Sequence, residues 1–206
     1  MRSRVAAFAL AASLLPAAAL PSPARSETVE RVVAVVDDRP VMLSELRAHQ
    51  AVSSLPEAEA LEEAIDERLM NAEASRMPQA EVAPEEETKA LALLLETHPA
   101  ARAQVSEAEL RRLLHRQLAI LKYVDFRFRP QLRVSDEEVR EAWRQEQAGR
   151  PSGPAFEDEQ DVIRARLERR ALDERVEAWV KELRARADVR YVPAPPALAG
   201  AGPGGP

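Results

Sequence analysis

The stretch VERVVAVVDDRPVM, residues 29–42, decides the fold because it holds the one clear β-hairpin signal, at the start of the folded chain. Four valines among residues 32–36 form a nearly continuous β-branched run, which is typical of a strand. DDRP has the composition of a tight turn, and a short second strand is expected at residues 41–42. A two-stranded hairpin is marginally stable alone, so this one needs a partner.

The partner is expected at the opposite end of the chain, in DVRYV, residues 188–192. Val189 and Tyr191 alternate with Arg190, and Val and Tyr favour strands. The simplest arrangement pairs the two ends of the folded chain in one small sheet.

Helices are predicted for the rest of the chain. No glycine occurs before Gly149, and glycine usually supplies hairpin turns and bulges, so a large sheet is improbable. The predicted fold class is therefore mostly α: a multi-helix domain with a small β-sheet formed by the N-terminal hairpin and the C-terminal strand.

Caps mark several helix boundaries. Ser44, followed by Glu45, predicts an N-cap. Pro84 fits the first position of a helix with acidic residues in its first turn. The capping boxes SEAE, residues 106–109, and SDEE, residues 135–138, begin two more helices.

Apolar residues follow the helical period in three long segments. The second helix carries Leu61, Ile65, Leu69 and Ala72. The helix after residue 106 carries Leu110, Leu114, Leu118, Leu121 and Phe128, and Pro130 ends it. The last helix, about residues 157–187, carries Ile163, Leu167, Leu172, Val176, Trp179, Leu183 and Ala187. This last face is expected to join the C-terminal segment to the N-terminal helices, with Trp179 touching those helices and Trp143 packed in the core.

Neither end of the sequence is expected to belong to the folded domain. Residues 1–24 combine a basic start, an apolar run and small residues at SPA, which predicts a signal peptide. Residues 193–206 are rich in Pro and Gly and are expected to be disordered. The expected folded body is residues 27–192, exported to a bacterial periplasm and with no membrane span after cleavage. The chain has no Cys, and a periplasm permits disulfides without requiring them.

Charge and composition argue against several functions. Without the two arginines of the predicted signal peptide, 27 basic residues face 35 acidic ones, a net charge of −8. Such a chain is a poor nucleic-acid binder. The absence of Cys excludes a thiol nucleophile, and His49, His98 and His115 lack metal-ligand spacing. We predict no catalytic residue, no metal site, no cofactor, and no enzymatic activity.

Four segments resemble SurA-type periplasmic chaperones. VERVVAVVDDRPVMLSEL is similar to the start of their mature N-terminal domain, and AIDERLMNAEASRM…EVAPEEETKAL to its second and third helices. LRRLLHRQLAILKYVDFRFRPQLRVSDEEVREAW resembles the long helix and the exit helix. FEDEQDVIRARLERRALDERVEAWVKELRARADVRYV resembles the helix and strand that return to that domain. The resemblance covers residues 28–192 and implies a chaperone that holds unfolded exported or outer-membrane proteins without ATP.

The resemblance has one large gap. Members of the family carry parvulin-type prolyl isomerase domains between the exit and return helices, whereas only residues 147–155 lie there in this chain. A parvulin domain needs on the order of a hundred residues. The chain is therefore expected to be the chaperone module without its isomerase.

A holdase needs tolerant apolar contacts rather than reacting groups. Met and aromatic side chains adapt to varied partners. The residues proposed to contact a peptide, with core packing as the alternative for most of them, are Met42, Met70, Met77, Leu93, Leu94, Tyr123, Phe126 and Phe128.

Two other functions remain open at the level of sequence. The chain is either a promiscuous holdase or an assembly subunit of the cell envelope with one fixed partner. A peptidyl-prolyl isomerase is the remote third alternative, suggested by family name only. Oligomeric state and client identity do not follow from the sequence.

Overall fold

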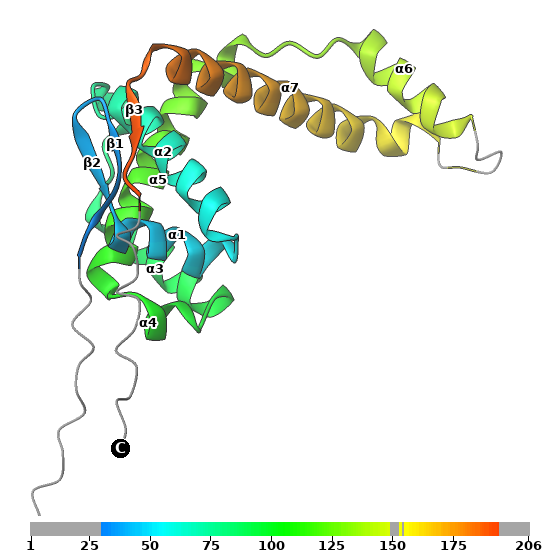
Figure 1. Ribbon diagram of the computed structural model, residues 1–206. Coiled ribbons are helices and arrows are strands. Elements are labelled where there is room, and N and C mark those ends of the chain that lie inside the picture. Colours follow the sequence, from blue (N-terminus) through cyan, green and yellow to red (C-terminus); the bar gives the residue numbers. More distant parts are fainter. Residues whose placement is uncertain (1–29, 149–152, 154, 194–206) are drawn as a thin grey trace, which may run out of the picture.

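The structure, a computed structural model, describes residues 30–148, 153 and 155–193. It consists of a helical body with a small sheet on one side, and of an arm that extends away from the body (Figure 1). The predicted signal peptide lies outside the described residues, as do all of the predicted tail but Pro193 and most of the loop at residues 147–155. The mostly α fold class is confirmed.

The sheet joins both ends of the folded chain, as predicted. It contains β1 (Val32–Val36), β2 (Arg39–Met42) and β3 (Val189–Tyr191), in the order β2-β1-β3. Both pairings are antiparallel, and β3 opposes β1 with Val35 facing Arg190. Asp37 N donates to Asp188 O, and Val192 N donates to Val33 O, each at 3.0 Å. The hairpin thus receives the partner that its marginal stability requires.

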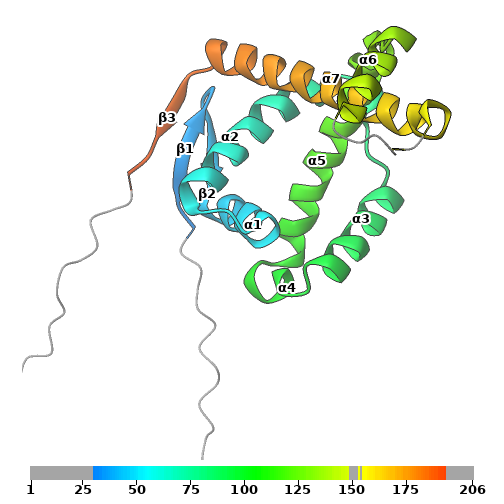
Figure 2. The same ribbon diagram turned by 90° about the vertical axis from the view of Figure 1, so that its right-hand side faces the viewer.

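Seven α-helices and two short 3-10 helices make up the rest of the described chain. They are α1 (Leu43–Ser53), α2 (Glu57–Ala74), η1 (Pro78–Ala80), α3 (Pro84–Thr97), α4 (Ala101–Gln104), α5 (Glu107–Arg127), η2 (Arg129–Gln131), α6 (Asp136–Gln147) and α7 (Phe156–Arg186). α5 runs through the middle of the body, between α2 and α3 (Figure 2).

Most of the predicted helix starts are confirmed. Pro84 occupies the first turn of α3, Ser106 Oγ accepts a hydrogen bond from Glu109 N, and Ser135 and Glu138 form the capping box of α6. The prediction for Ser44 is wrong. β2 runs directly into α1, so the last strand residue, Met42, is the N-cap, and Glu45 Oε2 accepts its N–H at 3.3 Å.

Two apolar clusters form the core. The larger combines β1, α2, η1, the C-terminal half of α5, and Trp179 and Leu183 of α7. The smaller combines α1, α3, α4 and the N-terminal half of α5. Because α5 serves both clusters, it buries more than one stripe: Leu113 is fully buried, whereas Leu121, predicted on the buried stripe, is 60 % exposed.

The buried face of α7 is divided between two partners, which corrects the prediction of one continuous contact with the N-terminal helices. Trp179 and Leu183 belong to the larger core cluster. Ile163 is buried, yet it belongs to neither cluster, and its half of α7 packs against α6, where Val139 is buried. Trp143 of α6 contacts Phe156 of α7, with ring centroids 5.8 Å apart, so it belongs to the arm and not to the core of the body.

Candidate peptide-binding groove

The segment between α5 and α6, residues 128–135, runs alongside α7 in the opposite direction (Figure 1). Arg175 Nη2 donates to Gln131 Oε1 at 3.4 Å. Further along, Arg164 donates to Val134 O at 2.8 Å and contacts Asp136 Oδ1 at 2.5 Å. These bonds fix the segment to α7 along much of its length.

An open groove follows the line where this segment meets α7. Two hollows of about 240 and 340 Å³ share Gln131, Arg175 and Ala178 and so form one continuous surface. We call it the linker groove, and define it by Arg127, Phe128, Gln131, Leu132, Arg133, Ala171, Glu174, Arg175, Ala178, Trp179 and Glu182. A third hollow, lined by residues that include Arg129, Glu168, Arg169, Leu172 and Asp173, adjoins it at Leu132.

Three aromatic rings support one end of the linker groove. Trp179 stacks on Tyr123 with centroids 5.0 Å apart, and Phe128 lies 5.5 Å from Trp179. The Arg127 guanidinium lies 5.7 Å from the Tyr123 ring centroid and donates to the Tyr123 hydroxyl at 2.7 Å. The aromatic packing holds the start of the 128–135 segment against α7.

The structure separates the eight residues predicted to contact a peptide. Leu93 and Phe126 are exposed, at 62 % and 51 %. Met42, Met70, Met77 and Leu94 are half-buried, and three of them, Met70, Met77 and Leu94, pack against the core clusters. Met77 lines a different hollow, next to α5. No single surface of the described chain collects all eight.

Two of these predictions need correction. Tyr123 is 2 % exposed and Phe128 6 % exposed, and both belong to the larger core cluster. Tyr123 is covered by the stacked ring of Trp179, which lies on α7 and is far from Tyr123 in the sequence. Phe128 keeps an edge in the linker groove but is chiefly a core residue.

Sequence reasoning missed most of the linker groove. Leu132, Arg133 and Arg175 belong to no helical stripe, and their proximity depends on how the 128–135 segment lies on α7. The one signal is RFRPQLR, residues 127–133, in which three apolar or proline residues alternate with basic and amide side chains at the helix end.

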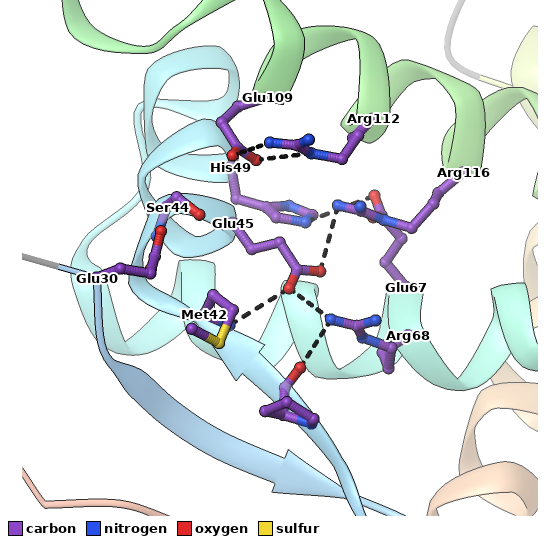
Figure 3. A network of polar contacts seen from close by, with 11 residues as sticks. Glu30, Met42, Ser44, Glu45, His49, Glu67, Arg68, Glu109, Arg112 and Arg116 are labelled. Carbon is purple, nitrogen blue, oxygen red and sulfur yellow. Dashed lines mark hydrogen bonds and ion pairs between the residues drawn. The ribbon is translucent and has the colours of Figure 1, made fainter. Parts of the chain in front are cut away.

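A network of charged and polar side chains lies inside the body, where α1, α2 and α5 meet (Figure 3). Glu45, His49 and Glu67 are buried. Arg116 Nε contacts Glu67 Oε1 at 2.5 Å, Arg68 Nη2 contacts Glu45 Oε2 at 2.5 Å, and His49 Nε2 lies 3.5 Å from Glu67 Oε2. Burial opposes the charge of Glu67, but His49 and Arg116 outweigh it, so the pKa of Glu67 lies below its usual value of 4.5.

The geometry of this network is that of a structural clamp. Each buried carboxylate faces at least one guanidinium, which is the arrangement that makes a buried charge tolerable. Across the described residues, no group of three or more His, Asp or Glu side chains is placed to hold a metal ion.

None of the helices in the described part of the chain is long and apolar enough to cross a membrane. Comparison with known proteins returned no matching family model and no matching curated protein. The resemblance to SurA-type chaperones therefore rests on the residues and the order of elements.

Proposed function

We propose that the chain is a periplasmic holdase that binds unfolded exported proteins, outer-membrane proteins among them, without ATP. The observation that carries the proposal is the linker groove, an open channel with apolar, aromatic and charged lining between the 128–135 segment and α7. An open groove of mixed lining makes tolerant contacts with many extended chains, whereas an enclosed site selects one ligand shape.

The arrangement of the chain supports the proposal. The sheet and the Arg184 clamp hold the C-terminal half of α7 on the body, where Arg184 Nη1 contacts Glu62 Oε2 at 2.6 Å and also bonds Asp66. α7 thereby presents the groove on a fixed support. Covering apolar client surface is favourable by about 25 cal/mol per Å², so holding a client needs no chemical energy.

The proposal includes no prolyl isomerase activity. α6 ends at Gln147 and α7 begins at Phe156, so the interval has no room for a domain of about a hundred residues. A protease-coupled assay on an Xaa-Pro peptide tests this directly. We expect the uncatalysed rate, and an acceleration comparable to that of a parvulin enzyme refutes this part of the proposal.

Promiscuity distinguishes a holdase from a subunit with one fixed partner. We expect the chain to bind several unrelated unfolded β-barrel proteins with similar affinity, and to ignore their folded forms, in fluorescence anisotropy titrations. Binding to one protein alone, folded or unfolded, identifies a fixed-partner subunit instead.

A matched pair of variants locates the binding surface. Ala178 is exposed and lies in the shared part of the linker groove, so Ala178→Trp fills it. Ala103 is exposed on α4, which contributes no residue to the linker groove, so Ala103→Trp is the control. We expect Ala178→Trp to weaken client binding and Ala103→Trp to leave it unchanged. Equal binding by both variants rejects the linker groove as the site.

A further inference from the structure

Three arginines of the linker groove have no carboxylate partner among the described residues. Arg127 donates to the Tyr123 hydroxyl, Arg133 donates to the carbonyl oxygens of Pro130 and Leu132, and Arg175 donates to the Gln131 side chain. All of these acceptors are neutral. Neutral oxygens alone therefore hold these three guanidinium groups in place.

Where other elements of the fold meet, arginine side chains contact carboxylates. Arg68 and Arg116 contact Glu45 and Glu67 inside the body, and Arg184 contacts Glu62 and Asp66 where α7 meets α2. A guanidinium that serves only to fasten two elements is most strongly held by a carboxylate. Because Arg127, Arg133 and Arg175 bind only neutral acceptors in the linker groove, they can still form ion pairs with the carboxylates of a ligand.

The acidic residues of the groove do not cancel these charges. Glu174 Oε1 accepts from Arg170 Nε at 2.9 Å, so its charge is already paired on α7. Glu182 lines the Trp179 end of the groove together with Arg127 and Arg175, and it does not line the part that holds Arg133. Three arginines against two glutamates give the groove lining a formal charge of +1, in a chain whose formal net charge is −6.

We infer that the linker groove selects acidic, extended polypeptide segments, with the side-chain carboxylates of the client bound by Arg133 and Arg175 and its apolar side chains lying toward Leu132 and the edge of Trp179. This inference rests on the proposed holdase function and names its preferred client chemistry. Guanidinium groups bind carboxylates in a directed, often bidentate geometry, which orients the client along α7.

The experiment compares three labelled peptides of equal length, in which Leu and Phe alternate with Glu, with Gln or with Lys. We expect the Glu peptide to bind most tightly and the Lys peptide most weakly. The preference should diminish as salt is raised, because exposed charges are screened within about 10 Å at 0.1 M salt. A single-stranded oligonucleotide serves as competitor, and tighter binding of the oligonucleotide than of the Glu peptide overturns the assignment to polypeptide.

The variant Arg133→Gln/Arg175→Gln removes two groove charges and retains Arg127, which supports the aromatic rings. The control Arg47→Gln/Arg102→Gln removes two exposed charges from α1 and α4, outside the groove. We expect the groove variant to bind the Glu peptide about fivefold more weakly and the Gln peptide as before, with the control unchanged.

Two outcomes distinguish a failure of the acidic preference from a failure of the proposed holdase function. Equal binding of the Glu and Gln peptides, while unfolded proteins still bind, overturns the acidic preference and leaves the holdase proposal standing. Loss of binding to all peptides and to unfolded proteins alike, in the parent chain, overturns both.

Discussion

Asp37 shows how a single residue joins the two ends of the chain. Asp37 and Asp38 both have positive φ, at 47° and 62°, so the β1–β2 turn is of the type that usually requires Asn or Gly. Asp37 Oδ1 also accepts the backbone N–H of Asp188 at 2.9 Å, just before β3. The residue thus shapes the hairpin and anchors the returning strand.

Replacing Asp37 tests both roles. Asp37→Ala is expected to lower the free energy of unfolding by about 1–2 kcal/mol, because Ala disfavours positive φ and lacks the acceptor. Asp37→Asn keeps both properties and should remain within about 0.5 kcal/mol of the parent. Urea denaturation measures the difference. Equal stability of the Ala and Asn variants contradicts this account of the turn.

Glu67 gives the body a defined dependence on pH. Its pKa is lowered on folding, so the folded chain holds this proton less tightly than the unfolded chain does. The resulting stabilisation is present above the ordinary pKa of 4.5 and is lost as the pH falls through the lower folded value. Glu67→Gln should cost about 3 kcal/mol near neutral pH, because it removes the buried carboxylate that Arg116 and His49 contact and leaves Arg116 with Glu45 alone.

Thermal unfolding of the parent and of Glu67→Gln across a pH series measures this contribution. The difference in stability between the two proteins should shrink steadily below about pH 4.5. A difference that stays constant from neutral to strongly acidic pH would show that Glu67 is not the group responsible.

At the level of elements, α7 has two tasks along one helix. Its C-terminal half buries Trp179 and Leu183 in the body, and its N-terminal half pairs with α6 to form the arm. Trp179→Ala removes a ring stacked on Tyr123 and should lower the free energy of unfolding of the body by about 3–5 kcal/mol. Arg169→Ala, an exposed change on the same helix, should stay within about 0.5 kcal/mol of the parent.

Ile163→Ala tests the other half of α7. Because Ile163 is buried in the arm and outside both core clusters, its loss should speed amide hydrogen exchange in α6 and in the first half of α7 while leaving the β1–β3 amides protected. Simultaneous loss of protection in the arm and the sheet contradicts the division of α7 into two units.

Local signals in the sequence predicted most elements, and long-range contacts account for the errors. The valines of β1, the caps at Ser106 and Ser135, and Pro84 act within a few residues, so their effects are visible in the sequence. The stepping of apolar residues along α7 identified a buried face but not the two partners that cover it. Tyr123 was misassigned for the same reason, since the ring that covers it comes from residue 179. Ser44 is a residue type that often caps helices, but it does not cap α1 because β2 leads directly into that helix.

The linker groove depends still more on long-range contacts. Arg133 and Arg175 are ordinary charged residues in the sequence, and only the antiparallel course of the 128–135 segment along α7 places them in one groove. Sequence patterns describe each helix face by itself and do not state which faces meet.

At the scale of the whole molecule, the sheet closes the chain on itself, and α7 extends from the body into the arm (Figures 1 and 2). The linker groove lies on the C-terminal half of α7. The body is held by two apolar clusters and by the ion pairs of Glu45 and Glu67 with Arg68 and Arg116, and of these residues only Trp179 and Phe128 also line the linker groove. Stability and proposed binding therefore reside in largely separate residues, except at Trp179 and Phe128. Changes in the groove away from these two rings should alter binding without unfolding the chain.

Suppression of aggregation measures directly whether the chain holds unfolded polypeptides. An unfolded outer-membrane β-barrel protein is diluted from denaturant, and light scattering is followed with and without an equimolar amount of the chain. We expect the parent and Ala103→Trp to keep the client soluble without ATP, and Ala178→Trp, at equal folded content, to protect it far less. Scattering that is the same with the parent chain as with buffer alone would contradict the claim that this protein holds unfolded polypeptides.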